Sequence, residues 1–184
     1  MSRLIKTSRL VVRPWESSDI ADAVNVYAAP PVARWMVPQL NATDEPVDLR
    51  TTFALWRAEA DDASGCIGHW AVQTRAGADV VGGLSLQYAP GGGESLTISW
   101  ALTPSAWGHG YAAEAGDALI RWAMHEEGVE EVFAILQPDN ARATATAQRI
   151  GMQWVSELGH LSRGRYQVYR LRHEDLAYEE EESG

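Results

Sequence analysis

The sequence has a single cysteine, Cys66, among its 184 residues. One thiol excludes an internal disulfide, and it leaves no second cysteine for a zinc site or a redox pair. We therefore expect Cys66 to be a small, partly buried residue without a chemical role.

Positive charge is scarce as well. The chain has 15 Lys and Arg residues against 25 Asp and Glu residues, which gives a formal net charge of −10. This balance excludes a typical nucleic-acid partner, because binding to a phosphate backbone requires a basic surface. It suits a cationic substrate such as an amine, and it equally suits simple solubility. Part of the charge lies in the acidic tail, residues 178–184, which we expect to be disordered.

Long apolar runs are also lacking. No stretch reaches about 18 apolar residues, the length that spans a membrane. Charges occur within residues 1–16, where a secretory signal needs an apolar segment. We therefore predict a soluble, cytoplasmic protein without membrane contact. A length of 184 residues allows one sizeable core and is short for two domains.

Periodicity and chain breakers predict the order of the elements. Helical spacing occurs at residues 16–28 and 44–62, and Pro30, Pro31 and Pro38 break the segment between these helices. Two further helices are expected at residues 112–128 and 140–151. Strands are expected at residues 8–15, 66–75, 80–89, 95–102, 129–137, 152–160 and 165–173.

The strands in the middle of the chain are joined by short turn segments and should form antiparallel hairpins. There is no internal repeat and no linker. The pattern therefore predicts one α+β domain with a mixed, mostly antiparallel sheet of about seven strands, flanked by about four helices.

Two glycines one residue apart, Gly108 and Gly110, precede the helix at 112–128 in the stretch PSAWGHGYAAEAG. A helix N-terminus has unpaired backbone N–H groups and a partial positive charge, so it can bind phosphate. Glycines remove side chains that would keep an anion away, and they permit angles that direct several N–H groups to one point. The loop therefore indicates a phosphate site.

Two nucleotide-binding motifs fit this loop poorly. A nucleoside-triphosphate loop ends in Gly-Lys-Ser/Thr, whereas tyrosine and alanine follow Gly110. The dinucleotide fingerprint G-x-G-x-x-A matches Gly108, Gly110 and Ala113. Its acidic residue, however, should close the next strand, and Glu130 and Glu131 precede that strand instead. We give this second motif less weight without discarding it.

The stretch SWALTPSAWGHGYAAEAGDALIRWAM, followed by QPDNARATATAQRIGM, resembles the core of the GNAT acyltransferases. The specific similarity is to the branch that acetylates ribosomal-protein N-termini, and TSRLVVRPWESSDI resembles the first strand and helix start of that branch. The resemblance covers about residues 7–172. It implies a single acetyltransferase domain within residues 1–184 that uses acetyl-CoA.

The resemblance also assigns the cofactor site. The family's Q/R-x-x-G-x-G/A pattern falls on residues 105–110, with Ser105 in place of the usual Gln or Arg, and should hold the diphosphate of coenzyme A. Asn140 matches the family's Asn at the cofactor arm, and it is equally suited to cap a helix. His109 also fits an exposed loop residue, and Glu114 fits a helix-stabilising acid. The implied cofactor contacts are Trp100, Ala101, Leu102, Thr103, Trp107, Gly108, His109, Gly110, Tyr111, Ala112 and Asn140.

The implied reaction is attack of a free amine on the thioester, which requires a proton for the departing thiolate. Family members often have a Ser three residues after the Asn, or a Tyr seven residues after it. These positions are Ala143 and Ala147 here. Thr144 or an ordered water remains as the proton donor. Glu94 is a candidate base, although it equally fits a solvated turn acid. No metal site is expected.

The resemblance places the acceptor pocket between the first two helices and the last hairpin. Trp35 and Met36 are candidate walls for an apolar or aromatic acceptor, or else core residues beneath those helices. The acceptor amine is expected on a protein N-terminus or on a small molecule, and a homodimer is left open. The alternative is a non-catalytic acyl-CoA-binding protein of the same fold, because the two alanines remove the usual hydroxyl groups.

Overall fold

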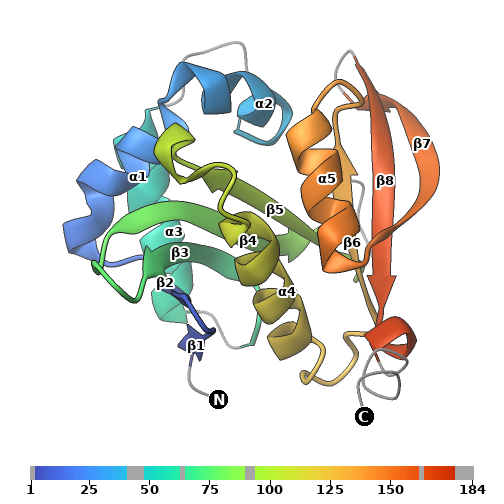
Figure 1. Cartoon of the computed structure of the whole chain (residues 1–184), viewed down its shortest axis with the longest axis horizontal. Helices are drawn as coiled ribbons and strands as arrows, with labels where there is room; N and C mark the ends of the chain where they lie inside the picture. The colour runs from blue at the N-terminus through green and yellow to red at the C-terminus, as the bar shows by residue number, and fades with distance from the viewer. Residues whose placement is uncertain (1–2, 41–47, 63–64, 90–93, 162–163, 177–184) are drawn as a thin grey trace.

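The structure is a computed structural model (Figure 1). The described residues are 3–40, 48–62, 65–89, 94–161 and 164–176. The tail at 178–184 lies outside them. The described strands form one mixed, mostly antiparallel sheet with helices packed on it, which confirms the predicted α+β class.

The strands are β1 (Ile5–Lys6), β2 (Leu10–Pro14), β3 (Gly68–Thr74), β4 (Val80–Tyr88), β5 (Leu96–Leu102), β6 (Glu131–Leu136), β7 (Gln153–Leu161) and β8 (Gly164–Arg172). The helices are α1 (Ile20–Tyr27), α2 (Pro30–Leu40), α3 (Leu49–Asp62), α4 (Tyr111–Ala123) and α5 (Ala141–Ile150), with short 3-10 turns η1 (Ser17–Asp19) and η2 (Pro104–Ala106).

Among the described residues, strand β1, helix α2 and a short helical turn at residues 173–176 go beyond the predicted seven strands and four helices. Strand β1 pairs only Ile5 with Val12 and Lys6 with Val11, which is too short for a periodic signal. The expectation of a break at Pro30, Pro31 and Pro38 is wrong, because this segment is helix α2. Pro30 and Pro31 occupy its first turn, where no helical acceptor is available for a backbone N–H, so proline is tolerated there.

The sheet order is β1-β2-β3-β4-β5-β6-β8-β7, and among the described strands only β5 and β6 run parallel to each other. Strands β3, β4 and β5 form the predicted antiparallel run. The parallel register holds for two pairs, Leu96 with Val132 and Thr97 with Phe133. Within the described part of the chain, the later residues of β5 and β6 are not paired with each other. The sheet is therefore open between these two strands.

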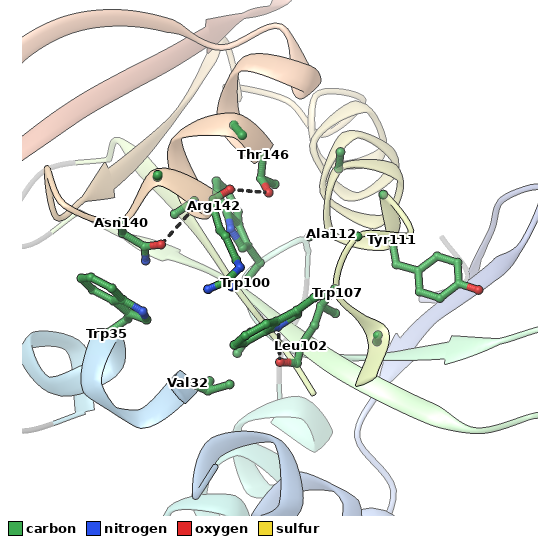
Figure 2. Close-up of a pocket in the computed structure, with 18 of the residues that line it drawn as sticks. Val32, Trp35, Trp100, Leu102, Trp107, Tyr111, Ala112, Asn140, Arg142 and Thr146 are labelled. Carbon is green, nitrogen blue, oxygen red and sulfur yellow. Dashed lines mark hydrogen bonds between the residues drawn. The ribbon is translucent and has the colours of Figure 1, made fainter. Parts of the chain in front are cut away.

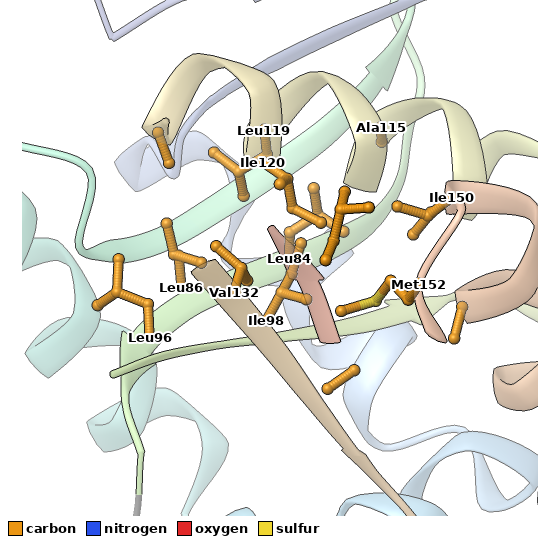
Figure 3. Close-up of a cluster of buried hydrophobic side chains, with 14 of the residues drawn as sticks. Leu84, Leu86, Leu96, Ile98, Ala115, Leu119, Ile120, Val132, Ile150 and Met152 are labelled. Carbon is orange, nitrogen blue, oxygen red and sulfur yellow. The ribbon is translucent and has the colours of Figure 1, made fainter. Parts of the chain in front are cut away.

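Each face of the sheet has its own core. On one face, α4 and α5 cover apolar residues of the central strands, and Figure 3 shows Leu84 and Ile98 meeting Ile120 and Ile150 there. On the other face, α1 and α3 enclose a smaller, aromatic cluster around Trp15. Buried residues recur every three to four positions in the helices and every second position in many of the strands, because these are the periods at which side chains face the same side.

Helix α4 packs closely on α5, and the first half of α4 lies against the last half of α5. Gly116 of α4 faces Ile150 of α5, and a Cβ atom at Gly116 would lie only 2.9 Å from Ile150 Cδ1. A glycine at this position therefore allows the two helices to approach. None of the described helices is long and apolar enough to cross a membrane.

Candidate active site

A cleft of about 400 Å³ opens where β5 and β6 separate (Figure 2). Helix α2 supplies one wall through Val32 and Trp35, and α5 supplies the opposite wall. The end of β5 and the loop before α4 form the floor. Nine of the predicted cofactor residues line this cleft: Trp100, Ala101, Leu102, Trp107, Gly108, Gly110, Tyr111, Ala112 and Asn140.

The glycine loop has the backbone that the sequence predicts. Gly108 and Gly110 have φ angles of 79° and 77°, a region that residues with a Cβ rarely adopt. A Cβ at Gly108 would meet nothing within 4 Å, so the backbone angle rather than lack of space requires glycine there. The first helical bond of α4 runs from the Glu114 N–H to the Gly110 carbonyl. The three preceding N–H groups therefore have no helical acceptor, as a phosphate site requires.

Glu114 anchors this loop to the N-terminal strands. Its carboxylate accepts hydrogen bonds from Thr7 Oγ1 (2.5 Å), Ser8 Oγ (3.1 Å) and the Arg9 backbone N–H (3.0 Å). The Arg9 guanidinium pairs with it at 2.6 Å and also donates to the His109 carbonyl at 2.9 Å. Burial raises the pKa of Glu114, but these hydrogen bonds outweigh burial and lower it. The carboxylate thus holds the loop in place.

Two predicted cofactor contacts, Thr103 and His109, are not among the residues lining the cleft. The Thr103 hydroxyl donates to the Val81 carbonyl at 3.3 Å. His109 is exposed, its Nδ1 donates to the Trp107 carbonyl at 2.9 Å, and its ring stacks on Tyr111. Both side chains therefore support the shape of the loop from outside.

Two arginines of α5 line the cleft and were not identified from the sequence. Arg142 and Arg149 are seven residues apart, so they share one helical face. The Arg142 guanidinium lies 4.2 Å from the centroid of the Trp107 ring. Trp107 Nε1 donates to the Leu102 carbonyl at 3.0 Å, a hydrogen bond drawn in Figure 2. The spacing of seven residues between the two arginines was the available signal. These arginines bring positive charge to the cleft that the glycine loop lines, in a protein that is acidic overall.

Asn140 caps α5, as predicted. Its Oδ1 accepts a hydrogen bond from the Ala143 N–H at 3.2 Å, and the residue also lines the cleft. Capping fixes the side chain, so its amide group has a defined orientation at the cleft wall.

The two catalytic candidates lie away from the cleft. Glu94 precedes β5, whereas the cleft lies at the far end of that strand, and Glu94 borders a different cavity beside Arg172. An α-helix turns about 100° per residue, so Thr144 points almost opposite to Thr146. Thr146 lines the cleft and Thr144 does not. The structure thus gives no support to Glu94 as base or to Thr144 as acid.

Trp35 and Met36 line the cleft and also a smaller cavity of about 50 Å³ beside it. Met36 belongs to the aromatic core as well, so wall and core roles coincide there. The two cavities share these residues with Trp100, Asn140 and Ala143, and Tyr166 of β8 closes the smaller one. The strand pattern at 165–173 gave no sign that Tyr166 faces a cavity.

A buried histidine, His69, lies outside this site. Burial lowers its pKa to about 3, and its ring stacks on Trp56 at 4.2 Å between centroids. The Gln87 amide donates to His69 Nε2 at 2.7 Å. The strongly lowered pKa of His69 therefore reflects burial in the aromatic core and does not mark the cleft.

An open parallel strand pair beside a helix N-terminus without helical acceptors is a geometry that can hold an extended, phosphate-bearing ligand. Residues 9–153 match the acetyltransferase (GNAT) domain, and the chain belongs to this family. The resemblance inferred from the sequence is confirmed.

The known relatives agree with this family. An uncharacterized N-acetyltransferase, YnaD of Bacillus subtilis, is 29% identical over 62 residues. That match spans 34% of this chain and 36% of the relative, or about a third of each. Among solved structures, a GNAT-family acetyltransferase from Bacillus anthracis has a TM-score of 0.76 at 21% identity and covers 93% of this chain and 99% of its own. Mycobacterium smegmatis RimJ in complex with CoA-disulfide has a TM-score of 0.69 at 17% identity, covering 91% and 83%. These structural likenesses support the fold.

Proposed function

We propose that the protein is an N-acetyltransferase that transfers the acetyl group of acetyl-CoA to a primary amine by direct attack on the thioester. The observation that carries the proposal is the meeting of two cavities at the opening between β5 and β6. A donor and an acceptor that enter from the two cavities can meet there without a covalent enzyme intermediate.

The residues of the cleft fit coenzyme A. The unpaired N–H groups of Tyr111, Ala112 and Ala113 suit its diphosphate, and Arg142 and Arg149 add charge beside them. The open edge of β5 leaves backbone groups that suit the amides of the pantetheine arm. The neighbouring RimJ structure contains a CoA-disulfide, which supports the same ligand here.

The residues of the chain orient the two reactants and exclude water from the opening. Bound acetyl-CoA supplies an activated acyl group with a thiol leaving group. Trp35, Trp100 and Trp107 surround the opening and exclude water, which strengthens every hydrogen bond made inside. The described residues lining the two cavities include no Asp, Glu or His. Solvent therefore accepts the proton that converts the acceptor from ammonium to neutral amine.

The acceptor is a protein N-terminus or a small-molecule amine. For the whole chain, the prediction remains a single cytoplasmic domain without nucleic-acid partners.

The second candidate function is a non-catalytic acyl-CoA binder. The alanines at 143 and 147 favour it, because neither can protonate a thiolate.

Release of free thiol from acetyl-CoA separates these functions. The assay uses a panel of amines: a peptide that begins with alanine, spermidine, and 2-phenylethylamine. We expect amine-dependent release with at least one of them. Tight binding of coenzyme A by calorimetry with no release above the rate in buffer for any amine would favour the binder.

A further inference from the structure

Tyr166 is a buried tyrosine that lines the smaller cavity beside the cleft. It is 7% exposed and lines the smaller cavity together with Ser99, Trp100 and Asn140. Its hydroxyl makes no hydrogen bond with any residue in the described part of the chain. The residue is buried, but its oxygen is not among the fully buried polar atoms, so the hydroxyl remains free to donate to a ligand in the cavity that the residue lines.

The strand register fixes the direction of this side chain. Strand β8 pairs Val168 with Ile135 of β6, and alternation places Tyr166 on the same face as these two residues. Leu136 and Tyr169 belong to the core beneath α4 and α5 and so lie on the opposite face. Tyr166 therefore approaches the opening from the side of α2, opposite to the α5 positions where hydroxyl groups were expected.

Four described hydroxyl residues line the two cavities: Tyr111, Thr146, Ser99 and Tyr166. Thr146 Oγ1 donates to the Arg142 carbonyl at 3.0 Å, and Ser99 Oγ pairs with Ser85 Oγ at 2.6 Å. Tyr111 stacks on His109 at the phosphate loop, away from the opening. Of these groups, the hydroxyl of Tyr166 is both at the opening and available.

We propose that Tyr166 is the catalytic proton donor to the departing thiolate. This assignment rests on the proposed acetyl transfer. As the amine nitrogen bonds to the acyl carbon and the carbon–sulfur bond breaks, the Tyr166 hydroxyl gives its proton to sulfur. The tyrosinate then takes the surplus proton from the new amide nitrogen. The nitrogen thus loses one proton, the thiol gains one, and Tyr166 is restored.

The position of the ring depends on Gly164. A Cβ at Gly164 would lie 3.3 Å from Tyr166 Cε2 and 3.4 Å from its Oη, so alanine there would displace the hydroxyl. Gly159, on the paired strand β7, has nothing within 4 Å of such a Cβ. The variants Gly164→Ala and Gly159→Ala therefore form a matched pair.

The kinetic test compares Tyr166→Phe with Tyr169→Phe, which removes a tyrosine hydroxyl from the other face of β8. With the best amine of the panel, we expect Tyr166→Phe to lower kcat roughly 100-fold at nearly unchanged KM for acetyl-CoA, as for loss of a general acid. Gly164→Ala should lower kcat in the same direction. Tyr169→Phe and Gly159→Ala should match the parent, and thermal melts should show that all four variants fold.

A binding test gives a readout without turnover. If Tyr166 faces the sulfur, Tyr166→Phe should weaken binding of coenzyme A roughly tenfold, but leave binding of a desulfo analogue unchanged. A Tyr166→Phe variant with the parent's kcat and the parent's preference for the sulfur-containing ligand would overturn the assignment while acetyl transfer stands. Absence of thiol release by the parent protein with every amine would instead overturn acetyl transfer, and the assignment with it.

Discussion

On one face of the sheet, α4 and α5 present unpaired backbone N–H groups and two arginines to a cleft. On the other face, α1 and α3 enclose aromatic rings around the buried His69. Both faces are covered by helices of ordinary amphipathic pattern, so packing alone does not distinguish them. The difference lies in what the polar groups face: the first-turn N–H groups of α4 and the two arginines face a cleft, whereas His69 is enclosed by its stacking partner Trp56 and its hydrogen bond to Gln87. Substitutions on the first face should therefore mainly change cofactor binding and activity, and substitutions on the second face should mainly change the free energy of unfolding.

The largest effect is expected for the glycine loop. Gly110→Val should weaken coenzyme A binding more than about 1000-fold in calorimetry, because valine at a φ of 77° distorts the N–H groups and blocks the anion. Gly128→Val is the control, since Gly128 has a φ of 85° and nothing within 4 Å of a Cβ. Both variants should lose similar stability. Equal affinity in the two would show that the loop holds no phosphate.

The aromatic face should control stability in acid. The pKa of His69 is about 3 in the folded protein against 6.5 as the ordinary value, so the unfolded chain binds the proton more readily. Stability from this group is complete above about pH 6.5 and falls as the pH drops toward 3. Between pH 7 and pH 4 we expect a loss of about 3 kcal/mol from His69.

Urea unfolding of the parent and of His69→Gln across this pH range measures that loss as a difference in slope. Coenzyme A affinity at pH 7 should be the same in both proteins. If the stabilities of the parent and of His69→Gln depended on pH in the same way, the role of His69 would be contradicted. If His69→Gln bound coenzyme A more weakly than the parent, the two faces would not be separate in their effects.

The charge on α5 should have an intermediate effect. Arg142→Ala should weaken coenzyme A binding roughly tenfold and reduce its salt dependence, since one phosphate contact is lost. Arg165→Ala removes an exposed arginine that pairs with Glu157 and should leave both quantities unchanged. Calorimetry at two salt concentrations makes the comparison, and an Arg142 variant that behaves like the Arg165 variant would place the phosphates elsewhere.

Asn140 links stability and binding. Asn140→Ala should cost about 1 kcal/mol of unfolding free energy through loss of the cap, and should also weaken cofactor binding. Asn140→Asp retains the capping oxygen but loses the amide donor. Chemical denaturation and calorimetry on both variants separate the effects. If both bind like the parent, Asn140 is a cap alone.

The smallest effect is expected for Thr144. Thr144→Val should leave kcat unchanged within about twofold, because this side chain points away from the cleft. Steady-state kinetics at acidic and alkaline pH check this expectation. A fall of 100-fold would restore Thr144 as the proton donor and would count against Tyr166.

Local chemistry in the sequence predicted the parts of the site that depend on one segment. The glycine loop, the Asn140 cap and the closure of α5 by Gly151 each follow from neighbouring residues. Pro30 and Pro31 were misinterpreted because proline breaks a helix interior but is accepted in a first turn.

The remainder depends on contacts between distant segments. The opening between β5 and β6 exists because pairing stops after Thr97 and Phe133, which no local pattern records. Thr144 was named as a candidate acid although it lies off the cleft, because the sequence does not show which face of α5 meets the cleft. Tyr166 joins the site only through the pairing of β8 with β6.

The most direct test of the central claim is a crystal structure of the protein with coenzyme A. We expect the diphosphate on the backbone N–H groups of Tyr111, Ala112 and Ala113, and the thiol at the opening between β5 and β6, within hydrogen-bond reach of Tyr166. Coenzyme A bound away from the glycine loop, or with its thiol directed out of that opening, would contradict the account.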